Sequence, residues 1–189
     1  MVRRILEAAG TVLADHGYDG TTTSRIASAA GISPGSLYQY FPNKDAVISA
    51  IADEYFSEME MRLIGHLANH MGSANERQMV RESLSVTLDA MTSRLELLRI
   101  ITENPRKFGA GRKTVALERQ LDELTSAHLR LRSQDLNSLR KISWILVRVI
   151  EHACIRYLLD RPPLDREEFL DEITVLVVSY VRNRGSLDE

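Results

Sequence analysis

The sequence predicts an all-helical protein, and three observations support that fold class. The chain of 189 residues has only 10 Gly and 5 Pro, whereas Leu, Ala, Glu and Arg, which favour helices, are abundant. Apolar residues recur three and four positions apart, the spacing of one helix face, rather than at every second position as in a strand. Capping and helix-stopping residues stand between these periodic segments. We expect an N-terminal three-helix unit joined to a larger helical domain.

Three short helices are predicted at the start of the chain. The first has an apolar face made of Ile5, Leu6, Ala9, Val12 and Leu13. It ends at Gly17, and the caps available to a short second helix are Thr22, Thr23 and Ser24. Gly31 fits the left-handed position just after that helix. Ser33 can cap a third helix with Pro34 at its first position, and this helix must end before Pro42.

Longer helices follow. A fourth, capped by Asn43, runs towards His70, and a fifth covers about 76–94 with a broken continuation to 103. Asn104-Pro105 opens a loop. The remaining predicted helices span 113–132, 136–159 and 165–182, and the last two are separated by Arg161-Pro162-Pro163.

Composition narrows the class of protein. Hydrophobic residues make up 44% and charged residues 26% of the chain, as in ordinary globular proteins. The single cysteine, Cys154, excludes an internal disulfide framework, and no signal peptide follows Arg3 and Arg4. The longest uncharged apolar run, Ile173 to Val181, is too short to span a bilayer. We therefore expect a cytoplasmic protein with no membrane partner.

The segment GISPGSLYQYFPNKDAV, Gly31 to Val47, predicts a function. Two short helices joined by a three-residue turn, with a helix before them, form a helix-turn-helix unit, whose second short helix enters the DNA major groove. Leu37 and Phe41, four positions apart, would face the core and orient that helix. The residues expected to read base edges are Pro34, Gly35, Ser36 and Gln39, and those expected to hold the sugar-phosphate backbone are Tyr38, Tyr40 and Lys44. Because the net charge is −2, this prediction depends on local geometry rather than on a basic field.

With Thr22 to Ala27 before it, this segment resembles the DNA-binding domain of the tetracycline-repressor (TetR) family over roughly Ile5 to Ile51. The resemblance implies a helix-turn-helix DNA-binding domain at residues 1–46 and a helical effector-binding and dimerisation domain at 47–189. It also implies that Thr23 and Ser24 contact phosphate or a base. Gln39 stands where the family commonly has an aromatic residue, which favours a different base preference, with adenine as the candidate partner of its amide.

Specific binding by so small a module calls for a homodimer on a two-fold double-stranded DNA operator. In the last two helices the predicted core residues include Val149 and Leu176. Beside this core face lies a second stripe of residues that mixes apolar and charged side chains. The predicted dimer interface consists of Trp144, Arg148, Glu151, Ile155, Val175 and Val178. The alternative is that neighbouring helices of the same subunit cover this stripe.

The middle helices are expected to enclose a pocket for an apolar small-molecule effector. Flexible methionines and flat aromatic rings suit such a pocket, and the candidate residues are Tyr55, Met59, Met91, Leu95 and Phe108. The alternative is that each of these side chains is an ordinary core residue.

No metal site, cofactor or catalytic site is predicted. His66 and His70 have metal-ligand spacing, but no third ligand is apparent from the sequence. Cys154 falls beside the core sector of its helix, which favours an inert buried thiol. No nucleophile elbow, phosphate loop or dinucleotide fingerprint occurs, so an enzyme is not expected.

The predicted function is therefore a ligand-responsive DNA-binding transcriptional regulator, a repressor that its effector releases from a palindromic operator. Two alternatives remain at this stage. One is a helical small-molecule-binding protein with a vestigial helix-turn-helix, and the other is a constitutive DNA-binding regulator without an effector.

Overall fold

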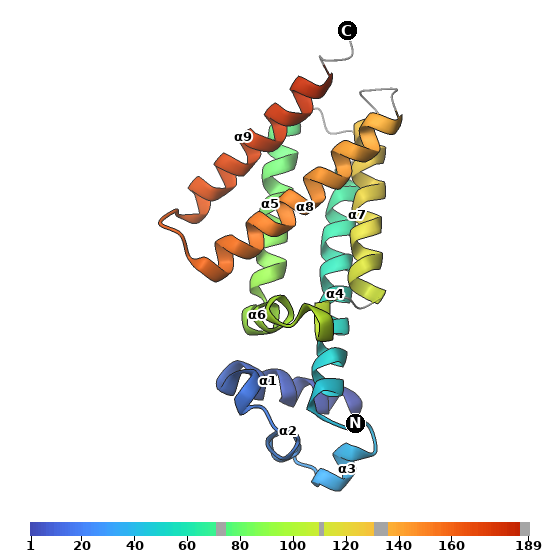
Figure 1. Cartoon of the computed structure of the whole chain (residues 1–189), viewed down its shortest axis with the longest axis vertical. Helices are drawn as coiled ribbons and strands as arrows, with labels where there is room; N and C mark the ends of the chain where they lie inside the picture. Colours follow the sequence, from blue (N-terminus) through green and yellow to red (C-terminus); the bar gives the residue numbers. More distant parts are fainter. Residues whose placement is uncertain (71–74, 110–111, 131–135, 186–189) are drawn as a thin grey trace. The chain divides into compact units, whose positions relative to one another are not determined.

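The computed structural model describes residues 1–70, 75–109, 112–130 and 136–185, and every regular element in these ranges is a helix (Figure 1). The predicted all-helical fold is confirmed. The chain divides into two compact units, one made of residues 1–57 and 94–115 and the other of 58–93 and 116–189. The long helix α4 (Lys44–Asn69) begins in the first unit and ends in the second.

The first unit contains the predicted three-helix arrangement. Its elements, besides the start of α4 and the first residues of α7 (Arg112–Arg130), are α1 (Val2–Gly20), α2 (Thr23–Ala29), α3 (Pro34–Tyr38), α6 (Leu95–Glu103) and the π-helical turn η1 (Pro105–Gly109). Helix α1 packs on α2 and α6, and α2 packs on α3. Fully buried side chains from these helices form the core, among them Ile5, Leu13, Ile26, Leu37 and Ile48. This core sets the orientation of α2 and α3.

Gly17 breaks the regular course of α1. Its φ of 64° and ψ of −176° lie outside the helical region, and a further turn then continues to Gly20. The buried Thr21 closes this end, since its hydroxyl donates to the Gly17 carbonyl at 2.7 Å. The first helix was predicted to end at Gly17; the structure instead has a break there within a helix that extends to Gly20, and the positive φ explains why glycine occupies the position.

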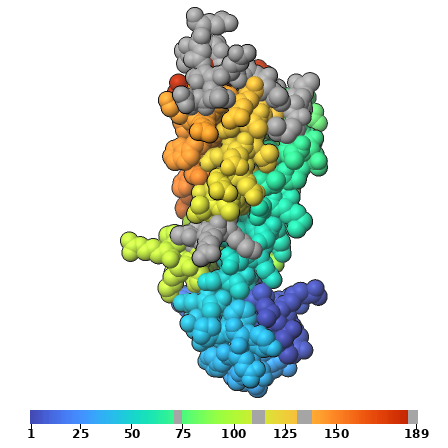
Figure 2. Space-filling view, turned by 90° about the vertical axis from the view of Figure 1, so that its right-hand side faces the viewer, coloured from blue at the N-terminus to red at the C-terminus, as the bar shows by residue number. Residues whose placement is uncertain are grey.

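The second unit is a bundle of longer helices. They are the end of α4, α5 (Glu76–Thr92), most of α7 (Arg112–Arg130), α8 (Leu136–Asp160) and α9 (Arg166–Gly185). Helix α5 packs against α8 and α9, and Figure 2 shows α7, in yellow, beside α8, in orange. One core cluster consists of Leu129, Leu139, Ile142, Leu146 and Val177.

Helix boundaries follow the predictions closely. Helix α8 ends at Asp160 and α9 begins at Arg166, on either side of the predicted proline stop. The predicted break after the fifth helix lies at Ser93 and Arg94, between α5 and α6. The predicted end of the next helix, at residue 132, lies outside the described residues. Among the helices that the structure describes, none has the length and apolar character needed to cross a membrane.

The predicted buried faces of α8 and α9 need correction. Val149 and Leu176, predicted as core, are exposed, at 39% and 50% respectively, whereas Val178, predicted to lie off the core, is only 7% exposed. The buried line of α9 runs through Leu170, Thr174, Val177 and Val178. Thr174 can occupy the core because its hydroxyl donates to the Leu170 carbonyl at 2.6 Å, within its own helix. The prediction counted only apolar residues on the helix face, so it did not place Thr174 in the core.

Candidate nucleic-acid interface

A glycine cap turns the chain from α2 into α3. The Gly31 N–H donates to the Ser28 carbonyl and the Ile32 N–H to the Ala27 carbonyl, each at 3.0 Å, which is the pair of bonds of a Schellman motif. Gly31 has a φ of 63°, a conformation strained for any residue with a Cβ atom. The predicted left-handed glycine is therefore confirmed, and it sets the direction in which α3 leaves α2.

Local capping also positions the start of α3. The Ser33 side-chain oxygen accepts from the Ser36 N–H at 3.1 Å, and Pro34 occupies the first turn, as predicted. Leu37 is fully buried and anchors the helix to the core. Helix α3 is only five residues long and ends at Tyr38, so Gln39 lies at its C-cap instead of within the helix. Pro34 and Gly35 in the first turn are exposed.

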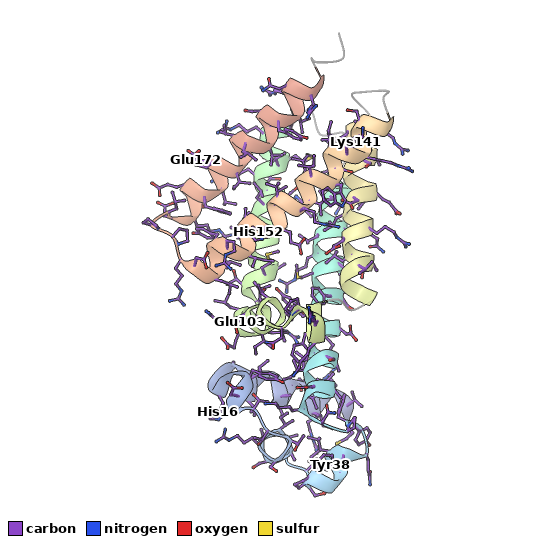
Figure 3. All side chains as sticks on the ribbon, viewed as in Figure 1. His16, Tyr38, Glu103, Lys141, His152 and Glu172 are labelled. Atoms are coloured by element: carbon purple, nitrogen blue, oxygen red, sulfur yellow. The ribbon has the colours of Figure 1, made fainter. Side chains whose placement is uncertain are left out.

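Two predicted DNA contacts touch each other across α2 and α3. The hydroxyl groups of Thr23 and Tyr38 lie 3.0 Å apart and share a hydrogen bond. Figure 3 shows Tyr38 at the end of α3, and its side chain is 53% exposed; that of Tyr40 is 45% exposed. The exposed hydroxyls of both tyrosines can donate to phosphate oxygens.

The predicted backbone cation Lys44 has partners within its own unit. Its ammonium donates to the Tyr18 carbonyl at 2.9 Å and lies 4.0 Å from the centre of the Tyr18 ring. The Tyr18 hydroxyl in turn donates to Asp45 Oδ1 at 2.7 Å. Lys107 also contacts both partners, and its hydrogen bonds to Tyr18 and Asp45 raise the pKa of its ammonium group. The Lys44 ammonium has three N–H donors, and the Tyr18 carbonyl accepts from one of them.

The candidate DNA-binding residues other than Lys44 come together on two short helices and the turn after them. Thr23 and Ser24 open α2, Pro34 to Ser36 open α3, and Gln39 and Tyr40 follow it, exposed like Tyr38. Between Gly20 and Lys44 the chain has no acidic residue, and its only other charge is Arg25, whose guanidinium donates to the Gly20 carbonyl. The structure thus presents a hydroxyl-rich surface without negative side chains. The DNA role of each residue stays a prediction.

The predicted dimer residues differ in exposure. Trp144 and Val175 are 56% and 42% exposed, whereas Arg148, Glu151 and Ile155 are half-buried. Val178 was also predicted to lie at the interface, but its side chain is only 7% exposed because its own subunit covers it. Three further apolar side chains of α8 and α9 are exposed although they were not predicted to lie at the interface: Ile145, Val149 and Leu176. The orientation of the two helices leaves them exposed, and the apolar pattern of the sequence does not specify that orientation.

Arg148 joins α8 to α7 within the second unit. Its Nη2 donates to Glu118 Oε2 at 2.8 Å, and Asp122 and Glu151 lie 3.9 and 4.0 Å from the guanidinium. Burial raises the pKa values of Asp122 and Glu151, and Arg148 opposes that rise. One guanidinium therefore neutralises part of a group of three carboxyls.

The predicted effector residues are mostly buried. Tyr55, Leu95 and Phe108 belong to the first unit, and Leu95 is the only half-buried one of these three. Met59 and Met91 belong to the second unit and are buried. Burial raises the pKa of the Tyr55 hydroxyl well above its ordinary range, so the ring stays neutral. Their effector role stays a prediction.

Residues 5–51 match the profile of the family described as bacterial regulatory proteins, tetR family. The fatty acid metabolism regulator protein of Bacillus subtilis (strain 168) is 27% identical over 190 residues, which cover 98% of this chain and 86% of that protein. The HTH-type transcriptional repressor Rv1474c of Mycobacterium tuberculosis is 29% identical over 108 residues, 54% of this chain and about half (52%) of that protein.

Solved structures with the same fold span nearly the whole chain. A putative tetR-family transcriptional regulator from Mesorhizobium loti has a TM-score of 0.73 at 17% identity, covering 96% of this chain and 95% of that one. The transcriptional regulator FadR from Bacillus subtilis in complex with stearoyl-CoA has a TM-score of 0.64 at 18% identity, covering 96% and 97%. At these identities the likeness shows a shared fold.

Proposed function

Because the chain belongs to the tetR family of bacterial regulatory proteins and is a DNA-binding transcriptional regulator, we propose that it is a repressor released from a palindromic operator by a small-molecule effector. The observation that carries this proposal is the α2–α3 surface, where a glycine cap, a buried Leu37 and the Thr23–Tyr38 hydrogen bond hold a short exposed helix in place. A regulator of chromosomal genes would act in the cytoplasm.

In the proposed complex, α3 enters the major groove by its first turn. Pro34, Gly35 and Ser36 would approach base edges, and the Gln39 amide would bond adenine. The backbone phosphates would be held by Thr23, Ser24, Tyr38, Tyr40 and Lys44. These residues supply hydroxyls and one ammonium, so the complex would depend on fitted hydrogen bonds more than on charge.

A homodimer would place two such helices on successive major grooves, with half-sites about 34–36 Å apart or a multiple of that spacing. We place the subunit interface on α8 and α9. The support is the exposed apolar surface of Trp144 and Val175, together with the neighbouring Val149 and Leu176 in the same two helices. Apolar residues that a subunit leaves exposed on long helices are typical of an oligomer interface.

We further propose that the effector is a long-chain fatty acyl-CoA. The support is the relative whose name is fatty acid metabolism regulator protein and the similar fold of FadR in complex with stearoyl-CoA. Within the second unit, the buried Met59 and Met91 are the proposed contacts for its apolar chain. The effector acts only if it binds the DNA-released conformation more tightly than the operator-bound one, since equal affinities shift no population.

The test is fluorescence anisotropy of the protein with DNA from just upstream of its own gene, at two salt concentrations, with a scrambled sequence as control. We expect binding that exceeds the control and survives the higher salt concentration, and release by stearoyl-CoA but not by free coenzyme A. Equal, weak and salt-sensitive binding to both DNAs would favour the vestigial helix-turn-helix. Specific binding that no acyl-CoA weakens would overturn the proposed effector while leaving the DNA-binding proposal in place.

A further inference from the structure

Two histidines at the end of α4 meet a glutamate of α5 within the second unit. His66 lies in the last turn of α4 and His70 directly follows the last residue of that helix, and the centres of their stacked rings are 4.2 Å apart. His70 Nε2 lies 3.6 Å from Glu82 Oε2. One potential ligand atom from each of the three residues lies within 4.8 Å of the others. The third ligand that the sequence does not reveal thus comes from the neighbouring helix.

The free imidazole nitrogens point to a ligand rather than to a closed hydrogen-bond network. His70 Nδ1 lies 2.8 Å from the His66 carbonyl and donates its proton there, which leaves the Nε2 lone pair of the neutral ring free for a metal ion. His66 Nε2 is buried and has no hydrogen-bond partner among the described residues. A buried nitrogen without a partner is unfavourable, and a metal ion would satisfy it.

Glu82 is held by a second layer of polar residues. The Gln78 amide donates to Glu82 Oε1 at 2.9 Å, which leaves Oε2 directed at His70. Gln78 is itself fixed by Asn75, the N-cap of α5, whose amide donates to Gln78 Oε1 at 3.1 Å. A chain of hydrogen bonds from a helix cap to a carboxylate is how proteins orient metal ligands.

We propose that His66, His70 and Glu82 bind a zinc ion that links the end of α4 to α5. Two imidazoles and one carboxylate suit Zn²⁺, whereas Mg²⁺ and Ca²⁺ prefer oxygen ligands only. Zinc donors in a tetrahedral site lie about 3.4 Å apart, so these ligand atoms, now within 4.8 Å of one another, would close by up to about 1.4 Å. His70 and Glu82 are 37% and 42% exposed, which gives the ion access from solvent and room for a water as fourth ligand.

The first experiment is a titration of the full-length, tag-free protein with Zn²⁺ against a chromophoric chelator. We expect one zinc ion per chain, with binding lost in His66→Gln/His70→Gln and weakened at least about tenfold in Glu82→Gln and in Gln78→Ala. His152→Gln is the matched control, since His152 is an exposed histidine of α8 (Figure 3) and should leave binding unchanged. Circular dichroism checks that each variant is folded.

A second readout protects the test against a variant that fails to fold. Co²⁺ bound to the wild-type protein should give the visible absorption of a four-coordinate site with nitrogen and oxygen ligands, and added Zn²⁺ should bleach it. Zinc should also raise the melting temperature of the wild-type protein but not that of His70→Gln. The proposal is overturned if the wild-type protein binds no zinc, or if His66→Gln/His70→Gln binds it as tightly as the His152→Gln control.

Discussion

The Thr23 and Tyr38 hydroxyls lie 3.0 Å apart and link the first residue of α2 to the last of α3. They lie fifteen positions apart in the chain, and the contact is exposed to solvent. The buried Leu37 anchors α3 to the core, and this exposed hydrogen bond ties α3 to α2, so the orientation of α3 depends on polar contacts as well as on the core. Both partners are also predicted to contact DNA.

A double-mutant cycle with Thr23→Val and Tyr38→Phe should therefore detect coupling. We expect about 0.5–1 kcal/mol between the two changes, the ordinary net value of one hydrogen bond, measured as the free energy of unfolding in urea. Tyr40→Phe combined with Thr23→Val is the control and should show additive effects, because the Tyr40 hydroxyl takes no part in this contact. Additive effects for Tyr38 as well would contradict the account of how α3 is held.

Gly35 tests whether the first turn of α3 approaches DNA closely. A Cβ atom there would meet only Ser33 Oγ, at 3.8 Å, so Gly35→Ala should leave the free protein folded. DNA affinity should nevertheless fall about tenfold, which corresponds to about 1.4 kcal/mol. Gly10→Ala in α1 is the matched control: apart from its chain neighbours and the backbone of its own helix, no atom lies within 4 Å of the added Cβ, and the change should add about 0.5–1 kcal/mol of stability without altering DNA binding. Unchanged operator affinity in Gly35→Ala would place the groove contact elsewhere.

Arg148→Met should destabilise the protein in a pH-dependent way. Its loss leaves Glu118, Asp122 and Glu151 without their shared cation, and we expect a decrease of about 1–3 kcal/mol in unfolding free energy at pH 7. Burial raises the pKa values of Asp122 and Glu151, so the native state holds their protons more tightly than the unfolded state does. Their contribution to stability is greatest at acid pH and is lost as pH rises through the raised pKa values.

The destabilisation by Arg148→Met should therefore shrink as pH falls from 7 towards 5. Arg156→Met is the matched control on the same helix, since Arg156 pairs with Asp160 at the surface, where both side chains are 48% exposed. It should change stability by less than about 1 kcal/mol. Urea unfolding at several pH values gives the change in unfolding free energy for each variant. A destabilisation by Arg148→Met that is equal at pH 5 and pH 7 would rule out the three carboxyls as its cause.

Cys154 should be chemically inert in the native protein. Burial raises the pKa of its thiol to about 12, so the reactive thiolate is nearly absent at pH 8, and folding favours the protonated form. We expect Ellman's reagent to modify Cys154 only after urea unfolds the protein. Rapid modification of the folded protein at pH 8 would show that the thiol is accessible and ionised.

Features that depend on neighbouring residues could be predicted from the sequence. Gly31, Ser33 and Pro34 specify the turn and the start of α3 by local backbone rules, and the structure places each of them as expected. The same holds for the proline stop between α8 and α9. Local signals therefore sufficed for the fold class and for the helix-turn-helix.

Features that depend on how helices pack could not be predicted. Leu176 and Val178 are both apolar and two positions apart, so only the orientation of α9 decides which of them is buried. Lys44 folds back onto Tyr18, 26 residues earlier, a contact that no local pattern encodes. Glu82 meets His66 and His70 only because α5 returns beside the end of α4.

The central claim is that the helix-turn-helix reads DNA in part through Gln39, at the C-cap of α3, while Lys44 holds the phosphate backbone. The most direct test measures binding of Gln39→Ala and Lys44→Ala to the operator and to single-base variants across a range of salt concentrations, with Lys107→Ala as control for the shared Tyr18 contact. Gln39→Ala should relax preference at one base pair, whereas Lys44→Ala should weaken binding to all sequences and lower the salt slope by about 1. Binding by both variants that matches the wild type in affinity, preference and salt slope would contradict the account.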